Sequence, residues 1–143
     1  MNKSHITPDI KFPIIVITPD GTTTFYLNEN PLVKVNKNVF TKRIIHESII
    51  IDADAVKYKI QDITNLGYTN KLMGLNIFFE KNIYLQITLQ KIKELDLNEF
   101  KSYIIKLIDQ NEDYYASAGM NVEDMKTQIA VSKDKSEILS MII

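Results

Sequence analysis

Between residues 11 and 91, apolar side chains recur mostly at every second position, which is the period of a β-strand. The clearest case is residues 83–91, where Ile83, Leu85, Ile87 and Leu89 alternate with Tyr84, Gln86, Thr88 and Gln90. An antiparallel sheet with one face in solvent produces this alternation. Residues 11–18 are instead nearly all apolar, which predicts a strand covered on both faces.

These strands are expected to pair as three hairpins. The expected pairs are 11–18 with 22–27, 48–52 with 56–63, and 75–80 with 83–91. Residues 31–44 fit neither the strand nor the helix period, so a short helix or an irregular crossover is expected there. Residues 64–76 contain two of the four glycines and are expected to form a loop.

After residue 95 the apolar period becomes that of a helix. In residues 96–110 the apolar positions fall on one helical face: Phe100, Ile104, Leu107 and Ile108. Asp96 or Asn98 stands at the N-cap position, with Glu99 in the first turn. Two further helices are predicted, one over 121–131 capped by Asn121 and one over 132–143 capped by Ser132 or Asp134.

The predicted fold is therefore α+β, with an antiparallel β-meander of about six strands over residues 11–91 and two or three C-terminal helices over 96–143. A chain of 143 residues is about one domain long. A domain of that size buries roughly 68–70% of its unfolded surface, so it needs no metal or disulfide to hold a core. Residues 1–143 are interpreted as a single domain.

Composition removes several classes of function. The chain has no cysteine, which excludes thiolate catalysis, cysteine-based zinc sites, iron–sulfur clusters and disulfides. The first apolar stretch is short and is broken by Pro13, so neither a signal peptide nor a membrane span is predicted, and a soluble cytoplasmic protein is expected. Arg43 is the only arginine against sixteen lysines, which argues against sequence-specific DNA binding. No cofactor is expected.

Two short acidic segments could be loops with chemistry or simple turns. Pro19, Asp20 and Gly21 have the residue types of a type I turn with a glycine bulge, and a β-rich run follows where a phosphate site would need a helix. Asp52 and Asp54 could hold a metal ion, with His46 nearby in sequence, or could be ordinary residues of a hairpin. The geometric interpretation is favoured for both segments.

Charge is distributed unevenly along the chain. Residues 94–124 carry eight acidic side chains and two lysines, a local net charge of −6, although the whole chain carries −1. Tyrosines are enriched at protein interfaces, and two of them are expected in the polar loop between the helices. The predicted partner-binding residues are Asp109, Glu112, Asp113, Tyr114, Tyr115, Glu123 and Asp124. The alternative is a solvated loop whose acids complement helix N-termini.

In its overall organisation the chain resembles immunity-type proteins of bacterial toxin–immunity loci. Like them it is small and cysteine-free, with a meander followed by helices and an acidic face. The resemblance covers the whole chain without any motif, so no residue roles are carried over. It implies a non-catalytic protein that neutralises a basic toxin partner. A metal-assisted hydrolase or transferase using Asp52 and Asp54 is one alternative. The other is an oligomerising module, because open sheet edges invite pairing.

Overall fold

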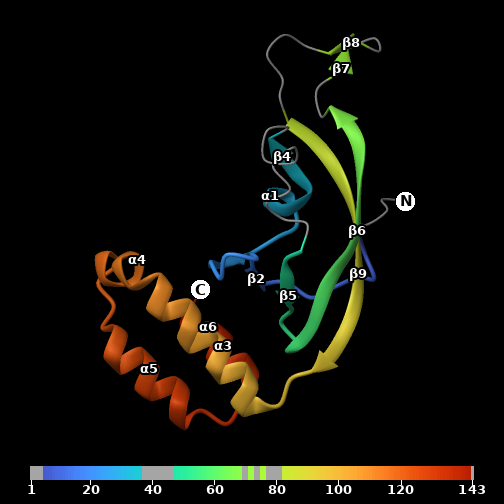
Figure 1. The fold of residues 1–143 in the computed structure, drawn as a ribbon. Coiled ribbons are helices and arrows are strands. Elements are labelled where there is room, and N and C mark those ends of the chain that lie inside the picture. Colours follow the sequence, from blue (N-terminus) through green and yellow to red (C-terminus); the bar gives the residue numbers. More distant parts are fainter. Residues whose placement is uncertain (1–4, 37–46, 69–70, 73–74, 77–81, 143) are drawn as a thin grey trace.

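A computed structural model describes residues 5–36, 47–68, 71–72, 75–76 and 82–142 of the chain (Figure 1). It is an α+β structure in which a mixed sheet is followed by a layer of C-terminal helices. The predicted α+β class is confirmed, but the predicted antiparallel meander is only partly right, because the sheet is mixed. Within the described residues, none of the helices is long and apolar enough to cross a membrane.

The main sheet has seven strands in the order β1-β9-β6-β5-β2-β3, with β4 also paired to β9. Their bounds are β1 Ile6–Thr7, β2 Ile14–Ile17, β3 Thr23–Tyr26, β4 Lys34–Asn36, β5 Ile49–Ile51, β6 Val56–Tyr68 and β9 Asn82–Glu94. Neighbouring strands are antiparallel, except that β1 runs parallel to β9. Pairs such as β2 with β5 and β4 with β9 join strands that do not follow each other in the chain. A separate two-stranded sheet pairs β7, Lys71–Leu72, with β8, Leu75–Asn76.

The first two predicted hairpins, β2–β3 and β5–β6, are present, but the third is wrong. The partner of β9 is β6, which pairs with it from Val56 opposite Glu94 to Tyr68 opposite Ile83. Residues 64–68, expected in a loop, therefore belong to a strand. Residues 75–76 pair with 71–72 instead of with β9, and 77–81 lie outside the described residues.

No strand was predicted before residue 11, but the described part of the N-terminal segment joins the sheet. Ile6 is buried and lies opposite Ile87, whose backbone N–H donates to the carbonyl of His5 at 2.8 Å. The outer edge of β9 supplies these hydrogen-bonding groups, which no local sequence pattern reveals. The uncertain segment 31–44 contains a short helix, α1 (Asn30–Val33), and then β4, while 37–44 lie outside the described residues.

The C-terminal part contains α3, Leu97–Gln110; α4, Glu112–Ser117; α5, Val122–Val131; and α6, Lys135–Ile142. Three of these four helices were predicted, and their caps form as expected. Asp96 accepts from the Glu99 N–H at 2.8 Å, while the Glu99 carboxylate accepts from the Asp96 N–H at 3.1 Å. Asn121 caps α5 and Asp134 caps α6 through the same kind of side-chain bond.

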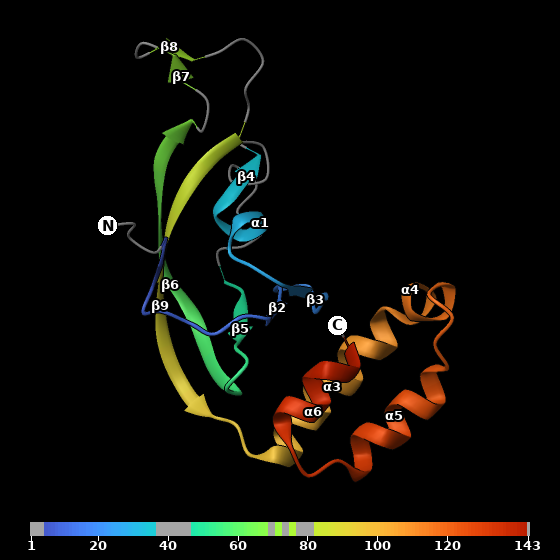
Figure 2. The same cartoon turned by 180° about the vertical axis from the view of Figure 1, so that it is seen from behind.

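The strand pair β2–β5 separates two hydrophobic cores. Ile15 and Ile51 pack with the helices in one core, which we call the helix-facing core. Their neighbours Ile14 and Ile50 pack in the other with α1, β4 and the inner face of β9, and we call this the concave core. The helices gather beside β2, β3 and β5, whereas α1 and β4 lie next to the upper part of β6 and β9 (Figure 2). The prediction that the strand in residues 11–18 is covered on both faces is confirmed for β2.

Candidate functional site

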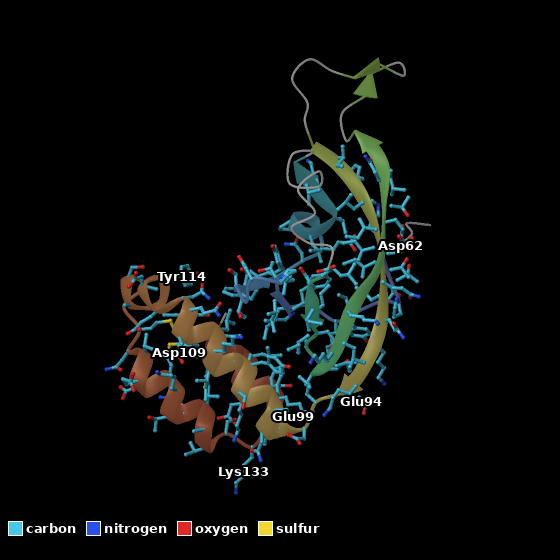
Figure 3. All side chains as sticks on the ribbon, in the orientation of Figure 1. Asp62, Glu94, Glu99, Asp109, Tyr114 and Lys133 are labelled. Atoms are coloured by element: carbon cyan, nitrogen blue, oxygen red, sulfur yellow. The ribbon has the colours of Figure 1, made fainter. Side chains whose placement is uncertain are left out.

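Most of the predicted partner-binding residues lie where α3, α4 and α5 meet. We call this surface the acidic end, and define it by Asp109, Glu112, Asp113, Tyr114, Glu123 and Asp124, all exposed. The first four of these residues line one hollow of about 390 Å³ together with Gln110 and Asn111. Asp109 and Tyr114 lie at this end of the molecule, whereas Asp62 lies on the opposite side, on the β6–β9 hairpin (Figure 3).

One lysine links the two halves of the acidic end. The Lys126 ammonium lies 2.8 Å from an oxygen of Asp109 and 3.3 Å from an oxygen of Glu123. The hydrogen bonds to Asp109 and then to Glu123 raise the pKa of Lys126, so the lysine stays charged and offsets part of the negative charge. Residue 126 follows the acidic stretch of the sequence directly, and only the fold shows that it reaches back to α3.

The two tyrosines have different environments, and the expected loop between the helices is instead the helix α4. Tyr114 is 59% exposed, whereas Tyr115 is 1% exposed and belongs to the helix-facing core. The Tyr115 hydroxyl donates to the carbonyl of Ile142 at 3.1 Å, and burial raises the pKa of Tyr115 to about 12. The inclusion of Tyr115 among the surface residues was therefore wrong.

Tyr115 nevertheless contributes to the acidic end by positioning its neighbour. The two rings meet edge to face, with centroids 5.2 Å apart and an interplanar angle of 80°. Edge-to-face aromatic pairs are favourable at this separation. Because Tyr115 is fixed in the core, the exposed ring of Tyr114 rests on a rigid support.

The acidic end also lies at the negative pole of a helix. Asp109 is in the last turn of α3, which contains no basic residue. The dipole of a helix makes a carboxylate at its C-terminus unfavourable and a cation favourable. Glu112 and Asp113 are in the first turn of α4, where the dipole of that short helix favours them.

Next to the acidic end, two side-chain amides join α3 to the β2–β3 hairpin. Gln110 accepts from the Thr23 N–H at 2.6 Å and donates to the Gly21 carbonyl at 2.7 Å. Asn111 donates to the Thr23 carbonyl at 3.1 Å. We call these three bonds the amide clamp. The residues that it joins are 87 to 89 positions apart in the chain, so sequence patterns gave no sign of it.

The loop that the clamp holds is the predicted turn. The Gly21 N–H donates to the Thr18 carbonyl at 2.8 Å, and Gly21 has a φ of 88°, which suits glycine. The Asp20 carboxylate accepts from the Thr18 hydroxyl and from the Thr22 N–H at 3.0 Å. Both bonds lower the pKa of Asp20, and the bond from the Thr18 hydroxyl has the larger effect. The hydrogen bonds confirm a turn closed by a glycine bulge.

The other acidic segment also has a backbone role. One oxygen of the buried Asp52 accepts from the N–H groups of Asp54 and Val56, at 3.0 and 3.1 Å, and so closes the β5–β6 turn. Its other oxygen accepts from the Lys11 N–H at 3.4 Å. Asp54 is exposed, and its carboxylate lies 3.6 Å from the Lys11 ammonium.

The Asp52 carboxylate is thus already occupied by backbone N–H donors. Among the described residues, no group of three or more His, Asp or Glu side chains is placed to hold a metal ion. His46, considered alongside Asp52 and Asp54, lies outside the described residues. The chemistry that the described surface offers most clearly is the binding of cations at the acidic end.

No protein-family model, curated protein or solved structure matches this chain.

Proposed function

We propose that this protein is a small non-catalytic binding protein whose acidic end engages a basic protein partner. The observation that carries the proposal is the exposed Tyr114, which shares one hollow with the carboxylates of Asp109, Glu112 and Asp113. Tyrosine contributes a large contact area at a small entropy cost, and carboxylates pair with lysine and arginine. A partner with lysine or arginine around an apolar contact suits this surface.

The position of the charges supports the same proposal. Asp109 lies at the unfavourable end of α3, and the only ammonium within ion-pair distance among the described residues is that of Lys126. A carboxylate at this pole is unfavourable for α3 itself, and Lys126 offsets part of its charge. A cation from a partner would be favourable here both for the carboxylates and for the negative pole of the α3 dipole.

Within this class, the specific form that we propose is an immunity-type protein that neutralises a basic toxin in the cytoplasm. Opposite charges on two surfaces accelerate their association and make it sensitive to salt. Rapid capture is what a cell needs from a protein that inactivates a toxin. The buried Asp52, whose carboxylate is held by backbone donors, gives no support to the hydrolase alternative.

The test compares proteins captured from the native lysate by the wild-type protein and by the triple variant Glu112→Lys, Asp113→Lys, Glu123→Lys. The variant should lose a basic partner that the wild-type protein retains at low salt and releases at high salt. The matched control is Asp62→Lys, Glu94→Lys, Glu137→Lys, which changes the net charge equally on other exposed surfaces. An identical partner list for all three baits would contradict the proposal.

A further inference from the structure

The hydrogen-bonding groups at one edge of the sheet suggest how a partner would bind. β3 is the last strand in the order β1-β9-β6-β5-β2-β3, and among the described residues it pairs only with β2. In an antiparallel pair, every second residue points its N–H and C=O away from the partner strand. On β3 these residues are Thr23 and Phe25, because the ladder to β2 begins with the bond from Thr18 N–H to the Thr22 carbonyl.

The amide clamp occupies the first of these two positions. Thr23 donates to Gln110 and accepts from Asn111, at 2.6 and 3.1 Å. A side-chain carboxamide offers the same kinds of donor and acceptor as a peptide bond, an N–H and a C=O. Gln110 and Asn111 therefore satisfy Thr23 as the backbone of a neighbouring strand would.

The second position, at Phe25, is not paired within the part of the chain that the structure describes. No hydrogen bond joins the outward N–H or C=O of Phe25 to any other described residue. The Phe25 ring packs against the helix-facing core, so the backbone at this residue is held in place. An unpaired strand edge of this kind is a template for an added strand.

The open edge is continuous with the acidic end. A hollow of about 410 Å³ beside β3 is lined by residues 20–23 together with Lys106, Gln110 and Asn111. Gln110 and Asn111 also line the hollow of the acidic end. A segment that lies along β3 and continues past these two amides would reach Asp109, Glu112 and Asp113.

We propose that the edge of β3 accepts an extended, lysine- or arginine-rich segment of the partner as an additional strand. The segment pairs with Phe25, replaces Gln110 and Asn111 at Thr23, and places its basic side chains on the acidic end. This inference rests on the proposed function and adds the mode of binding. A second copy of the chain fits less well, because pairing two β3 edges would bring two acidic ends together.

The test uses a synthetic peptide in which lysine and valine alternate, and a counterpart with the same side chains and every backbone nitrogen methylated. Methylation removes the strand's hydrogen-bond donors and keeps its charge. Hydrogen exchange measured by NMR should be fast at the Phe25 amide in the free protein. It should become at least about tenfold slower when the unmethylated peptide is bound, whereas the methylated peptide should give no protection.

Two variants separate the backbone contact from the side chain. Phe25→Pro removes the outward N–H while leaving the ladder to β2, and Phe25→Ala removes the ring while keeping the N–H. Phe25→Ala should bind the peptide, and Phe25→Pro should bind at least about tenfold more weakly, a loss of roughly 1.4 kcal/mol. If Phe25→Pro does not fold, the exchange experiment on the wild-type protein decides alone.

Three outcomes would overturn strand addition. Equal binding of both peptides without protection at Phe25 would show attachment by charge alone, and the proposed function would stand. A Phe25 amide already protected in the free protein, with a dimer seen by sedimentation, would show that a second copy occupies the edge. Failure of both peptides to bind would also overturn it, while the capture experiment would still decide the proposed function separately.

Discussion

The hydroxyl of Tyr115 donates to the carbonyl of Ile142 at 3.1 Å and so ties α4 to the end of α6. Both residues are buried, at 1% and 2% exposure. The bond holds α4 in place. The same helix carries Tyr114, the residue before Tyr115, which is exposed at the acidic end. The stability of this surface therefore depends on a contact that lies beneath it.

Replacing Tyr115 by phenylalanine should remove this bond and keep the ring. The Ile142 carbonyl would lose its donor, and the free energy of unfolding should fall by about 1 kcal/mol. Tyr115→Ala should cost about 3–5 kcal/mol because it also leaves a cavity. Urea denaturation measures both values. Tyr114→Phe is the control, since that side chain is exposed. Equal stability of Tyr115→Phe and the wild-type protein would contradict the role of the bond.

The same tyrosine predicts a loss of stability in alkali. Burial raises the pKa of Tyr115 from 10.0 to about 12, so the unfolded chain loses its proton at a lower pH than the folded chain. The protonated Tyr115 therefore contributes fully to the free energy of unfolding below pH 10. This contribution declines as the pH rises towards 12, by about 2–3 kcal/mol in all. Denaturation at a series of pH values should show a smaller decline for Tyr115→Phe. Parallel curves for the two proteins would refute this origin.

Breaking the amide clamp should loosen the β2–β3 hairpin. Gln110→Ala leaves the N–H of the buried Thr23 without its acceptor, and the expected cost is about 1–3 kcal/mol. Hydrogen exchange at the Thr23 amide should accelerate more than exchange elsewhere in β3. The control is Gln128→Ala, which removes an exposed glutamine from α5. The clamp would have no structural role if both variants exchanged alike.

The two aspartates of the β5–β6 turn should respond differently to mutation. Asp52→Ala should destabilise the protein by about 1–3 kcal/mol, because three backbone N–H groups lose their acceptor. Asp54→Ala should change stability by less than about 0.5 kcal/mol, since the residue is exposed. Thermal melting with and without Mn²⁺ checks both. Stabilisation of the wild-type protein by Mn²⁺ that is lost in either variant would favour a metal site instead.

Local patterns predicted the elements whose signals are complete within a short segment. The helix α3 has a regular apolar face and a capping box, and its bounds were predicted closely. The alternation of β9 also identified its buried face correctly. In both cases the residues that determine the element lie within it.

The pattern failed where backbone irregularities or tertiary contacts decide the structure. Bulges near Asp62 and Gly67 shift the register of β6, so its apolar positions lose their period of two and its last residues resemble a loop. The helix α4 is only six residues long and is held by the burial of Tyr115. The amide clamp, next to the candidate site, forms between residues too distant in sequence for any local rule to connect.

The sharing of β2 and β5 by the two cores has a consequence for how the chain could be divided. Ile50 and Ile51 are adjacent, yet their side chains pack on opposite sides of the same strand. A fragment ending before α3 would leave Ile15 and Ile51 facing water, and isolated helices would lack the wall that β2 and β5 provide. The sheet and the helices are thus inseparable halves, and fragments of either are expected to be insoluble or unfolded when expressed alone.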